Sequence, residues 1–201
     1  MTPWLWFLAG LLGLGAVFLV LELLVRRRAL GSELTRRFAH VAACLFALLV
    51  YATLGPWGVA VLGFGFALAM LASRALKLLT SIHNTRRRSL GEVYLPLGLG
   101  IVALLAFDDP AMFTASALVL GLADVAAGLV GDLLDSHTKT WRGSAAFFVV
   151  TVIVLLACGY PPLASGCVGL LVTFVERASP YGSDNITIPL ATALLLLLSA
   201  T

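Results

Sequence analysis

The stretch AMFTASALVLGLADVAAGLVG, residues 111–131, is an apolar run that contains a single ionisable side chain, Asp124. In a helix these 21 residues rise about 30 Å, which is the thickness of the hydrocarbon core of a bilayer. The run lacks the period-two alternation of a transmembrane β-strand, so we interpret it as a membrane-spanning helix. An ionised carboxylate in such a helix costs at least about 2.5 kcal/mol and indicates a functional site by default.

Similar apolar runs occupy most of the remaining sequence. The chain is 61% hydrophobic and 11% charged, whereas soluble domains average about 45–50% apolar and about 25% charged residues. We therefore predict an all-α fold, a polytopic integral membrane helix bundle with seven or eight transmembrane helices, which forms a single integral membrane domain over residues 1–201. The other runs are residues 4–25, 38–54, 57–73, 90–107, 144–159, 163–175 and 186–200.

The 13 lysine and arginine residues gather on alternate connections between these runs. Basic connections of membrane proteins stay on the cytoplasmic side, so we expect a multi-pass protein of the cell (inner) membrane, with active-site loops at the cytoplasmic face and the N-terminus outside. All three histidines and most acids lie in or beside the same patches. The patches are residues 26–37, 74–88, 139–142 and 177, and the connections without basic residues are those around 55–56, 108–110 and 160–162.

The first two patches each combine acids with arginines. In GSELTRRFAH, residues 31–40, Glu33, Arg36, Arg37 and His40 share one helical face. A helix start at the membrane interface, with Glu33 paired to Arg37, explains this pattern except for His40, which lies one turn deeper.

The segment NTRRRSLGEVYLP, residues 84–96, contains Arg87 and Glu92. Here Ser89 and Glu92 fit a capping box at a helix start. The arginines fit either a topological anchor or an anion site beside a helix N-terminus.

Around Asp124, glycines recur on one helical stripe, at Gly121, Gly128 and Gly131. Glycines on both sides of a carboxylate allow another group to approach the backbone closely. The alternative is helix packing through small residues, with Asp124 hydrogen-bonded to a neighbour.

Three further acids or cations follow. Lys139 precedes Gly143-Ser144 at a predicted helix start, which could offer a cation and backbone N–H groups to a phosphate, although the P-loop pattern is absent. Glu176 ends an apolar run, and Asp184 precedes the last run, where it could also be a helix N-cap.

Glu92, Asp124, Glu176 and Asp184 are thus expected at one membrane depth, among arginines and a lysine. Oxygen ligands without soft ones suit Mg²⁺ that is shared with phosphate groups. The sequence therefore predicts a cytoplasm-facing site for a phosphate-bearing substrate. No nucleic-acid-binding motif is present, so we expect no nucleic-acid partner.

At these residues the chain resembles the dolichol kinase, phytol kinase and CTP-dependent diacylglycerol kinase family. The resemblance runs from about Glu33 to Pro189 and rests on five segments in order. They are ELTRRFAH, RRRSLGEVYLP, LADVAAGLVG, KTWRGS and ERASPYGSDNITIP. The family implies transfer of the terminal phosphate of a nucleoside triphosphate, typically CTP, to a lipid alcohol such as a polyprenol, phytol or diacylglycerol.

Carried over residue by residue, the resemblance implies three matched regions. Two departures from the family pattern, Arg142 in place of the usual Glu and the absence of a glycine near Asp135, lie in the expected nucleotide loop. The matched residues are Asp124, Ala127, Gly128 and Gly131; Lys139, Gly143 and Ser144; and Glu176, Asp184, Asn185 and Pro189.

We therefore expect an Mg²⁺-dependent phosphotransferase with Asp124, Glu176 and Asp184 at the metal and with Lys139 and Asp184 among the catalytic residues. The base is left open between His40, Glu92 and a carboxylate near Asp184. The residues expected at the nucleotide are Arg36, Arg37, Arg87, Gly128, Gly131, Lys139, Gly143, Ser144 and Asn185.

Two other functions are weighed against the kinase. A phosphatidate cytidylyltransferase is similar through the Asp124–Lys139 region, but its C-terminal Gly-His-Gly-Gly signature is absent from this chain. A small transporter would place polar groups near the bilayer midplane, whereas the acids here crowd toward one face.

Overall fold

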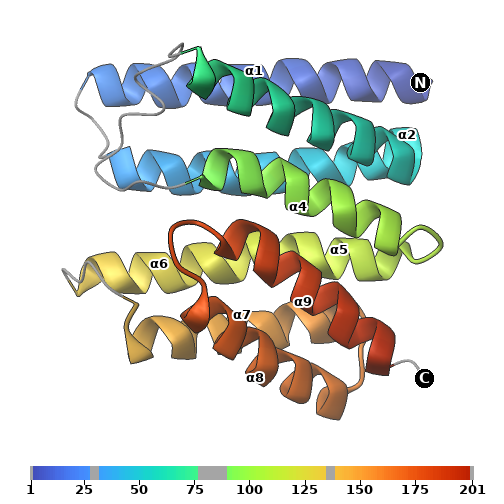
Figure 1. The fold of residues 1–201 in the computed structure, drawn as a ribbon, viewed down its shortest axis with the longest axis vertical. Helices are drawn as coiled ribbons and strands as arrows, with labels where there is room; N and C mark the ends of the chain where they lie inside the picture. The colour runs from blue at the N-terminus through green and yellow to red at the C-terminus, as the bar shows by residue number, and fades with distance from the viewer. Residues whose placement is uncertain (1, 28–31, 77–89, 135–138, 200–201) are drawn as a thin grey trace.

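The computed structural model describes residues 2–27, 32–76, 90–134 and 139–199, and within these ranges every regular element is a helix (Figure 1). This confirms the all-α prediction. The elements are α1 (Pro3–Arg26), α2 (Ser32–Ala75), α4 (Gly91–Leu105), α5 (Pro110–Leu118), the π-helical turn η1 (Val119–Ala123), α6 (Asp124–Leu133), α7 (Trp141–Ala157), α8 (Pro162–Ala178) and α9 (Asp184–Ser199).

Helix α2 bends sharply at Gly55-Pro56, so its two halves run in opposite directions (Figure 1). Gly55 has φ 72° and ψ −174°, a backbone conformation that strongly favours glycine. Pro56 lacks the N–H that would continue the helical hydrogen bonding. The bend therefore falls between the two apolar runs that the sequence separates at the same residues.

Among the described residues, three helical stretches are long and apolar enough to cross a membrane: Pro3–Leu24, Glu33–Ala75 and Pro110–Leu133. The last of these joins α5, η1 and α6 into one span. Shorter apolar helices lie at Gly91–Leu105, Trp141–Ala157 and Asp184–Ser199. The arrangement fits a helical membrane bundle, and the number of seven or eight spans stays a prediction.

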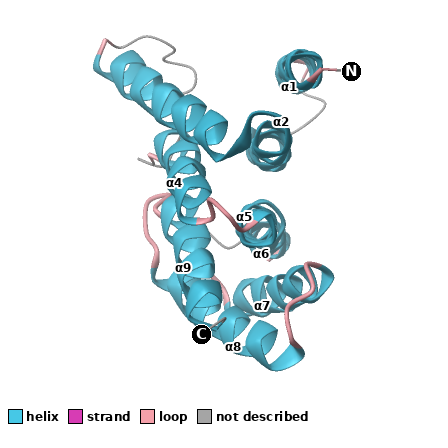
Figure 2. Cartoon of the chain, turned by 90° about the vertical axis from the view of Figure 1, so that its right-hand side faces the viewer, coloured by secondary structure: helices cyan, strands magenta, loops and turns pink. Residues whose placement is uncertain are grey.

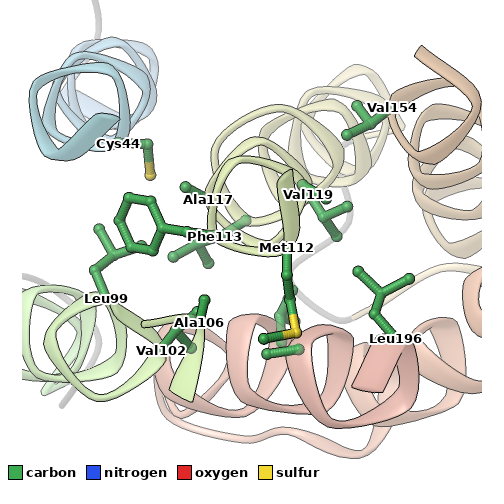
Figure 3. Packing of buried hydrophobic residues seen from close by; sticks show 14 of the residues in the cluster. Cys44, Leu99, Val102, Ala106, Met112, Phe113, Ala117, Val119, Val154 and Leu196 are labelled. Atoms are coloured by element: carbon green, nitrogen blue, oxygen red, sulfur yellow. The ribbon is translucent and has the colours of Figure 1, made fainter. Parts of the chain in front are cut away.

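The buried core lies where α2, α4, α5, α7 and α9 meet. Phe113 of α5 is fully buried and points toward Cys44 of α2 and Leu99 of α4 (Figure 3). Close contact between α2 and α4 depends on Gly63, where a Cβ atom would lie 2.4 Å from the Pro96 carbonyl oxygen. Viewed along the helices, α1 lies at the edge of the bundle beside α2 (Figure 2).

The two ends of the bundle differ in which helix termini they hold. One end, at the left of Figure 1, holds the C-terminal ends of α1, α6 and α8 and the N-terminal ends of α2, α4, α7 and α9. The other end holds the bend in α2, the α4–α5 and α7–α8 connections and both chain termini. The described residues of the basic patches and the connections without basic residues thus fall at opposite ends, as the charge pattern predicts.

Hydrogen bonds and aromatic contacts, with no ion pair among the described residues there, close the end without basic residues. The Tyr51 hydroxyl donates to the Ala106 carbonyl oxygen, and its ring stacks on Phe113 at 4.3 Å between centroids. The Asp109 side chain accepts a 2.9 Å hydrogen bond from the Met112 N–H and so caps α5. Trp57 and Phe107 meet edge to face.

Candidate active site

The basic end of the bundle contains an open cavity with about 660 Å³ of empty volume. The cavity is formed by the first turn of α2, by α6, and by the adjoining ends of α7, α8 and α9. Its lining residues are Arg36, Arg37, Asp124, Ala127, Gly128, Gly131, Asp132, Lys139, Thr140, Gly143, Ser144, Glu176 and Asp184.

Lys139 links the ends of three helices. Its ammonium lies 2.8 Å from Glu176 Oε1 and 3.2 Å from Asp184 Oδ2, and it also donates to the Glu176 carbonyl oxygen. Partial burial lowers the pKa of Lys139, but Asp184, Glu176 and Asp124 outweigh that effect and raise the pKa above its usual value. The ammonium is therefore a permanent positive charge in the cavity.

Glu176 is 4% exposed and is held from two sides. While Oε1 pairs with Lys139, Oε2 accepts a hydrogen bond of 3.4 Å from the Ser144 hydroxyl. The Arg177 guanidinium donates to the same hydroxyl at 3.3 Å and lies 3.8 Å over the ring of Trp141. A buried carboxylate with this support keeps a fixed orientation toward the cavity.

Asp124 is the first residue of α6 and directly follows the π-helical turn η1. Single π-turns occur often at functional sites, because the additional residue rotates the helix that follows. Upstream of the π-turn, Phe113 and Ala117 of α5 are fully buried in the core. The π-turn thus sets the direction of Asp124 relative to a segment that packing holds in place.

Arg37 reaches from α2 across to α6. Its Nη2 and Nε atoms lie 2.7 and 2.9 Å from Asp132 Oδ2, and the guanidinium lies directly over Gly128, where a Cβ atom would be 1.5 Å from Nη1. The predicted close approach to a glycine therefore occurs, with Arg37 as the approaching group. Glu33 pairs with Arg36 at 2.9 Å, so the expected Glu33–Arg37 pair is wrong, because Arg37 turns to Asp132.

Most of the predicted site residues meet in this cavity. His40 lies beside it, Glu92 pairs with Arg74 at 3.3 Å, and Arg87 lies outside the described residues together with Ser89 of the expected capping box. The predicted site residues that do line the cavity are Asp124, Lys139, Glu176, Asp184, Arg36, Arg37, Gly128, Gly131, Gly143 and Ser144.

Asn185 lies apart from the lining residues. It is 8% exposed, and its side-chain amide donates a 3.0 Å hydrogen bond to the Gly91 carbonyl oxygen, which ties α9 to α4. Close packing there involves Gly98, where a Cβ atom would lie 2.7 Å from the Asn185 carbonyl oxygen. The contacts of Asn185 are those of a residue that joins two helices.

Sequence reasoning missed Asp132, Thr140 and the role of Arg177. Asp132 lies one helical turn beyond Gly128, so the stripe of small residues could have indicated it. Thr140 accepts a 3.0 Å hydrogen bond from the Gly143 N–H and caps α7, an N-cap pattern that the sequence displays. The contact of Arg177 with Ser144 joins residues 33 positions apart and has no local signal.

Comparison with known proteins supplies one curated relative, the phytol kinase of Synechocystis sp., which is 30% identical to this chain. The match covers 95% of this chain and 91% of the relative. The chain belongs to the polyprenol and phytol kinase family. No family model and no solved structure matches it. The relationship confirms the resemblance read from the five ordered segments and supports a lipid-alcohol kinase.

For a member of the polyprenol and phytol kinase family, the charge balance of the cavity is informative. Four carboxylates and three cationic side chains line it, which leaves a formal charge of 3 − 4 = −1. In the described residues no three His, Cys, Asp or Glu side chains lie close enough to form a metal site on their own. Carboxylate oxygens are the type of ligand that hard cations prefer in proteins.

Proposed function

We propose that this protein is a lipid-alcohol kinase that transfers the terminal phosphate of a nucleoside triphosphate, CTP, to the hydroxyl group of a phytol-type or polyprenol alcohol in the membrane. The observation that carries the proposal is the single cavity in which Lys139, Arg36 and Arg37 meet Asp124, Glu176 and Asp184. Phosphoryl transfer depends mainly on positioning and charge neutralisation, and the cavity provides groups for both.

The cations of the cavity reach it from two different parts of the fold. Lys139 reaches into the cavity from the α6–α7 connection, and Arg36 and Arg37 reach in from the start of α2. Phosphate oxygens bound between them would have positive charge on two sides. Because Lys139 is paired with Glu176 and Asp184, incoming phosphates would share the ammonium with these carboxylates.

The carboxylates would hold Mg²⁺. Asp124 and Asp184, supported by Glu176, would supply the oxygen ligands, and the ion would contribute positive charge that neutralises the phosphate oxygens. Ser144 and Arg177 would keep Glu176 in place through the hydrogen bonds at its Oε2 side.

The position of the cavity suits one substrate from water and one from the bilayer. The cavity opens at the basic end of the bundle, where the positive-inside rule places the cytoplasm. The nucleotide would enter from that side. The alcohol would arrive laterally from the inner leaflet, with its hydroxyl group at the depth of Asp124 and its tail in hydrocarbon.

The test is a transfer assay with purified protein in detergent or liposomes. Each γ-labelled nucleotide, CTP, UTP, ATP or GTP, is offered with phytol, a polyprenol or diacylglycerol, and label is followed into the organic phase with and without Mg²⁺. We expect transfer from CTP to a prenyl-type alcohol that stops when EDTA is added. Label that enters lipid from α-labelled CTP would instead indicate a cytidylyltransferase, and no transfer to any alcohol would refute the proposal.

A further inference from the structure

A second, smaller cavity adjoins the main one. It is lined by Arg36, Arg37, His40, Asp124 and Val125. Three of these residues, Arg36, Arg37 and Asp124, also line the main cavity. The two spaces are thus separated by a wall made of two guanidinium groups and one carboxylate, the types of group that would surround a phosphoryl group during its transfer.

Of the ionisable residues that line the small cavity, only His40 does not also line the main cavity. Its Nε2 atom lies 3.3 Å from the Leu120 carbonyl oxygen. A carbonyl oxygen can only accept, so Nε2 must carry the proton, and in the neutral ring Nδ1 has the lone pair. The contact therefore selects the tautomer in which Nδ1 can accept a proton.

The carbonyl group that fixes His40 belongs to the π-turn η1. Two further contacts hold α2 in register with this region. Cys44 packs against Gly121, where a Cβ atom would lie 2.9 Å from the Cys44 Cβ, and Arg37 lies over Gly128. Successive turns of α2 thus contact successive turns around Asp124, with His40 between the two contacts.

We propose that the small cavity is the acceptor subsite, which receives the hydroxyl group of the lipid alcohol, and that His40 accepts the hydroxyl proton at Nδ1. The inference rests on the proposed kinase function and assigns its second substrate a place. In the step, the alcohol oxygen forms a bond to the terminal phosphorus while the bond from that phosphorus to the β,γ-bridging oxygen breaks. The nucleoside diphosphate leaves with the bond electrons, and the proton moves from the alcohol to His40 and then to water.

The arrangement of the cavities supports this assignment. In-line transfer needs the attacking and the leaving oxygen on opposite sides of the phosphorus. Lys139, Gly143 and Ser144 line only the main cavity, and His40 and Val125 line only the small one. A nucleotide in the main cavity and an alcohol in the small one would meet at the wall formed by Asp124 and the arginines.

The other two residues considered for the base are engaged elsewhere. Glu92 pairs with Arg74 and lines neither cavity. Asp184 pairs with Lys139 in the main cavity, on the nucleotide side of the wall. Of His40, Glu92 and Asp184, only His40 lines the small cavity. The carboxylate of Asp124 lines both cavities and is assigned to the metal in the proposed function.

The decisive experiment separates proton acceptance by His40 from a structural role. His40→Gln keeps an N–H donor for the Leu120 carbonyl oxygen but has no basic nitrogen. General bases typically contribute about 10²–10⁴-fold, so we expect kcat to fall by at least about 100-fold, with unchanged equilibrium binding of labelled nucleotide measured without alcohol. A His40→Gln variant with wild-type kcat would refute the base and leave only a positioning role.

His40→Ala provides an independent test, since it leaves space for an added base. We expect free imidazole to restore part of its transfer activity in a saturable manner, and to leave His40→Gln, whose side chain fills the space, unchanged. Failure of imidazole to raise the activity of a folded, nucleotide-binding His40→Ala protein would count against proton acceptance at this position.

The acceptor subsite is tested by filling it. Val125→Phe should raise the KM for the alcohol at least about tenfold and leave nucleotide binding unchanged, because Val125 lines only the small cavity. The matched control is Leu129→Phe, one turn further along α6 at an exposed position that lines neither cavity, which should behave as wild type. A higher KM for the nucleotide, with an unchanged KM for the alcohol, would assign the small cavity to the nucleotide and refute the inference.

These outcomes are distinct from a failure of the proposed function. If the wild-type protein transfers no phosphate to any alcohol, the kinase proposal itself fails. If the wild-type protein is active and the His40 and Val125 variants match it, the kinase proposal stands and the acceptor subsite is wrong.

Discussion

The two ends of the helix bundle are closed by different kinds of contact. At the end without basic residues, Tyr51 is hydrogen-bonded to the Ala106 carbonyl oxygen and stacked on Phe113, and Asp109 caps α5. At the basic end, ion pairs of Lys139 and Arg37 join helices α2, α6, α8 and α9. The contacts at the first end are not ion pairs, whereas the ion pairs at the basic end present charges that can bind a charged substrate.

The difference shows where stability and function lie. Half-exposed ion pairs such as Arg37–Asp132, whose acid is 46% exposed, contribute roughly 0–1 kcal/mol to stability. A hydrogen bond backed by aromatic packing contributes about as much or more without any charge. We therefore expect changes at the basic end to reduce activity more than stability, and changes at the opposite end to do the reverse.

The largest expected effect on activity is at Asp124. Asp124→Asn keeps the size of the side chain but removes its charge, so it should reduce kcat by at least about 10³-fold, with membrane insertion and melting temperature close to wild type. Transfer assays and a thermal melt in the same detergent measure both quantities. Wild-type turnover in this variant would remove Asp124 from the mechanism and break the contrast between the two ends.

Next in size is the effect of replacing Lys139. Lys139→Met removes the ammonium that faces Glu176 and Asp184, and loss of one such electrostatic contact typically costs about 10²–10³-fold in kcat. Lys139→Arg retains the charge and should be impaired less. Steady-state kinetics of the two variants at saturating nucleotide give the comparison, and equal activities would show that charge at this position is unimportant.

A smaller effect is expected at Gly121, behind the site. Gly121→Ala would bring a Cβ atom to 2.9 Å from the Cys44 Cβ and should push α2 away from the π-turn, which lowers kcat about tenfold through His40. Gly166→Ala, in α8 with nothing within 4 Å of the added atom, is the matched glycine control and should stay within about twofold of wild type. If both variants behave alike, the α2 contact does not position the site.

The smallest effect on activity is expected at the end of the bundle without basic residues. Tyr51→Phe removes only the hydroxyl that donates to the Ala106 carbonyl oxygen, so it should lower the free energy of unfolding by about 0.5–1.5 kcal/mol and leave kcat unchanged. Denaturant titration and the transfer assay on one preparation test this. A loss of activity larger than that of Gly121→Ala would show that the two ends are coupled.

The sequence predicted the helical fold and much of the site, because both follow from where charge is tolerated. A basic residue between two apolar runs must lie near a membrane surface, and alternation of such connections places them at one end. Glu92, Asp124, Glu176 and Asp184 each lie inside an apolar run or beside its end, so their common depth could be predicted. The meeting of Asp124, Glu176 and Asp184 in one cavity follows from the packing of α6, α8 and α9.

The features that the sequence could not predict depend on contacts between residues far apart in the chain, or on the one additional residue that a π-turn inserts into a helix. The Arg37–Asp132 pair joins positions 95 apart. The π-turn at Val119–Ala123 has no local sequence signature, yet it sets the direction of Asp124. Asn185 matches a family motif, but only the packing of α9 on α4 reveals its hydrogen bond to Gly91.

The position of α1 at the edge has a consequence for how the protein adapts to its bilayer. α1 has 24 residues and spans about 36 Å, whereas α9 has 16 residues and spans about 24 Å. A helix longer than the local hydrocarbon thickness tilts, and α1 packs closely only against α2 among the described helices. Tilting of α1 can therefore absorb a mismatch in lipid thickness, while the short helices around the cavity keep their relative positions.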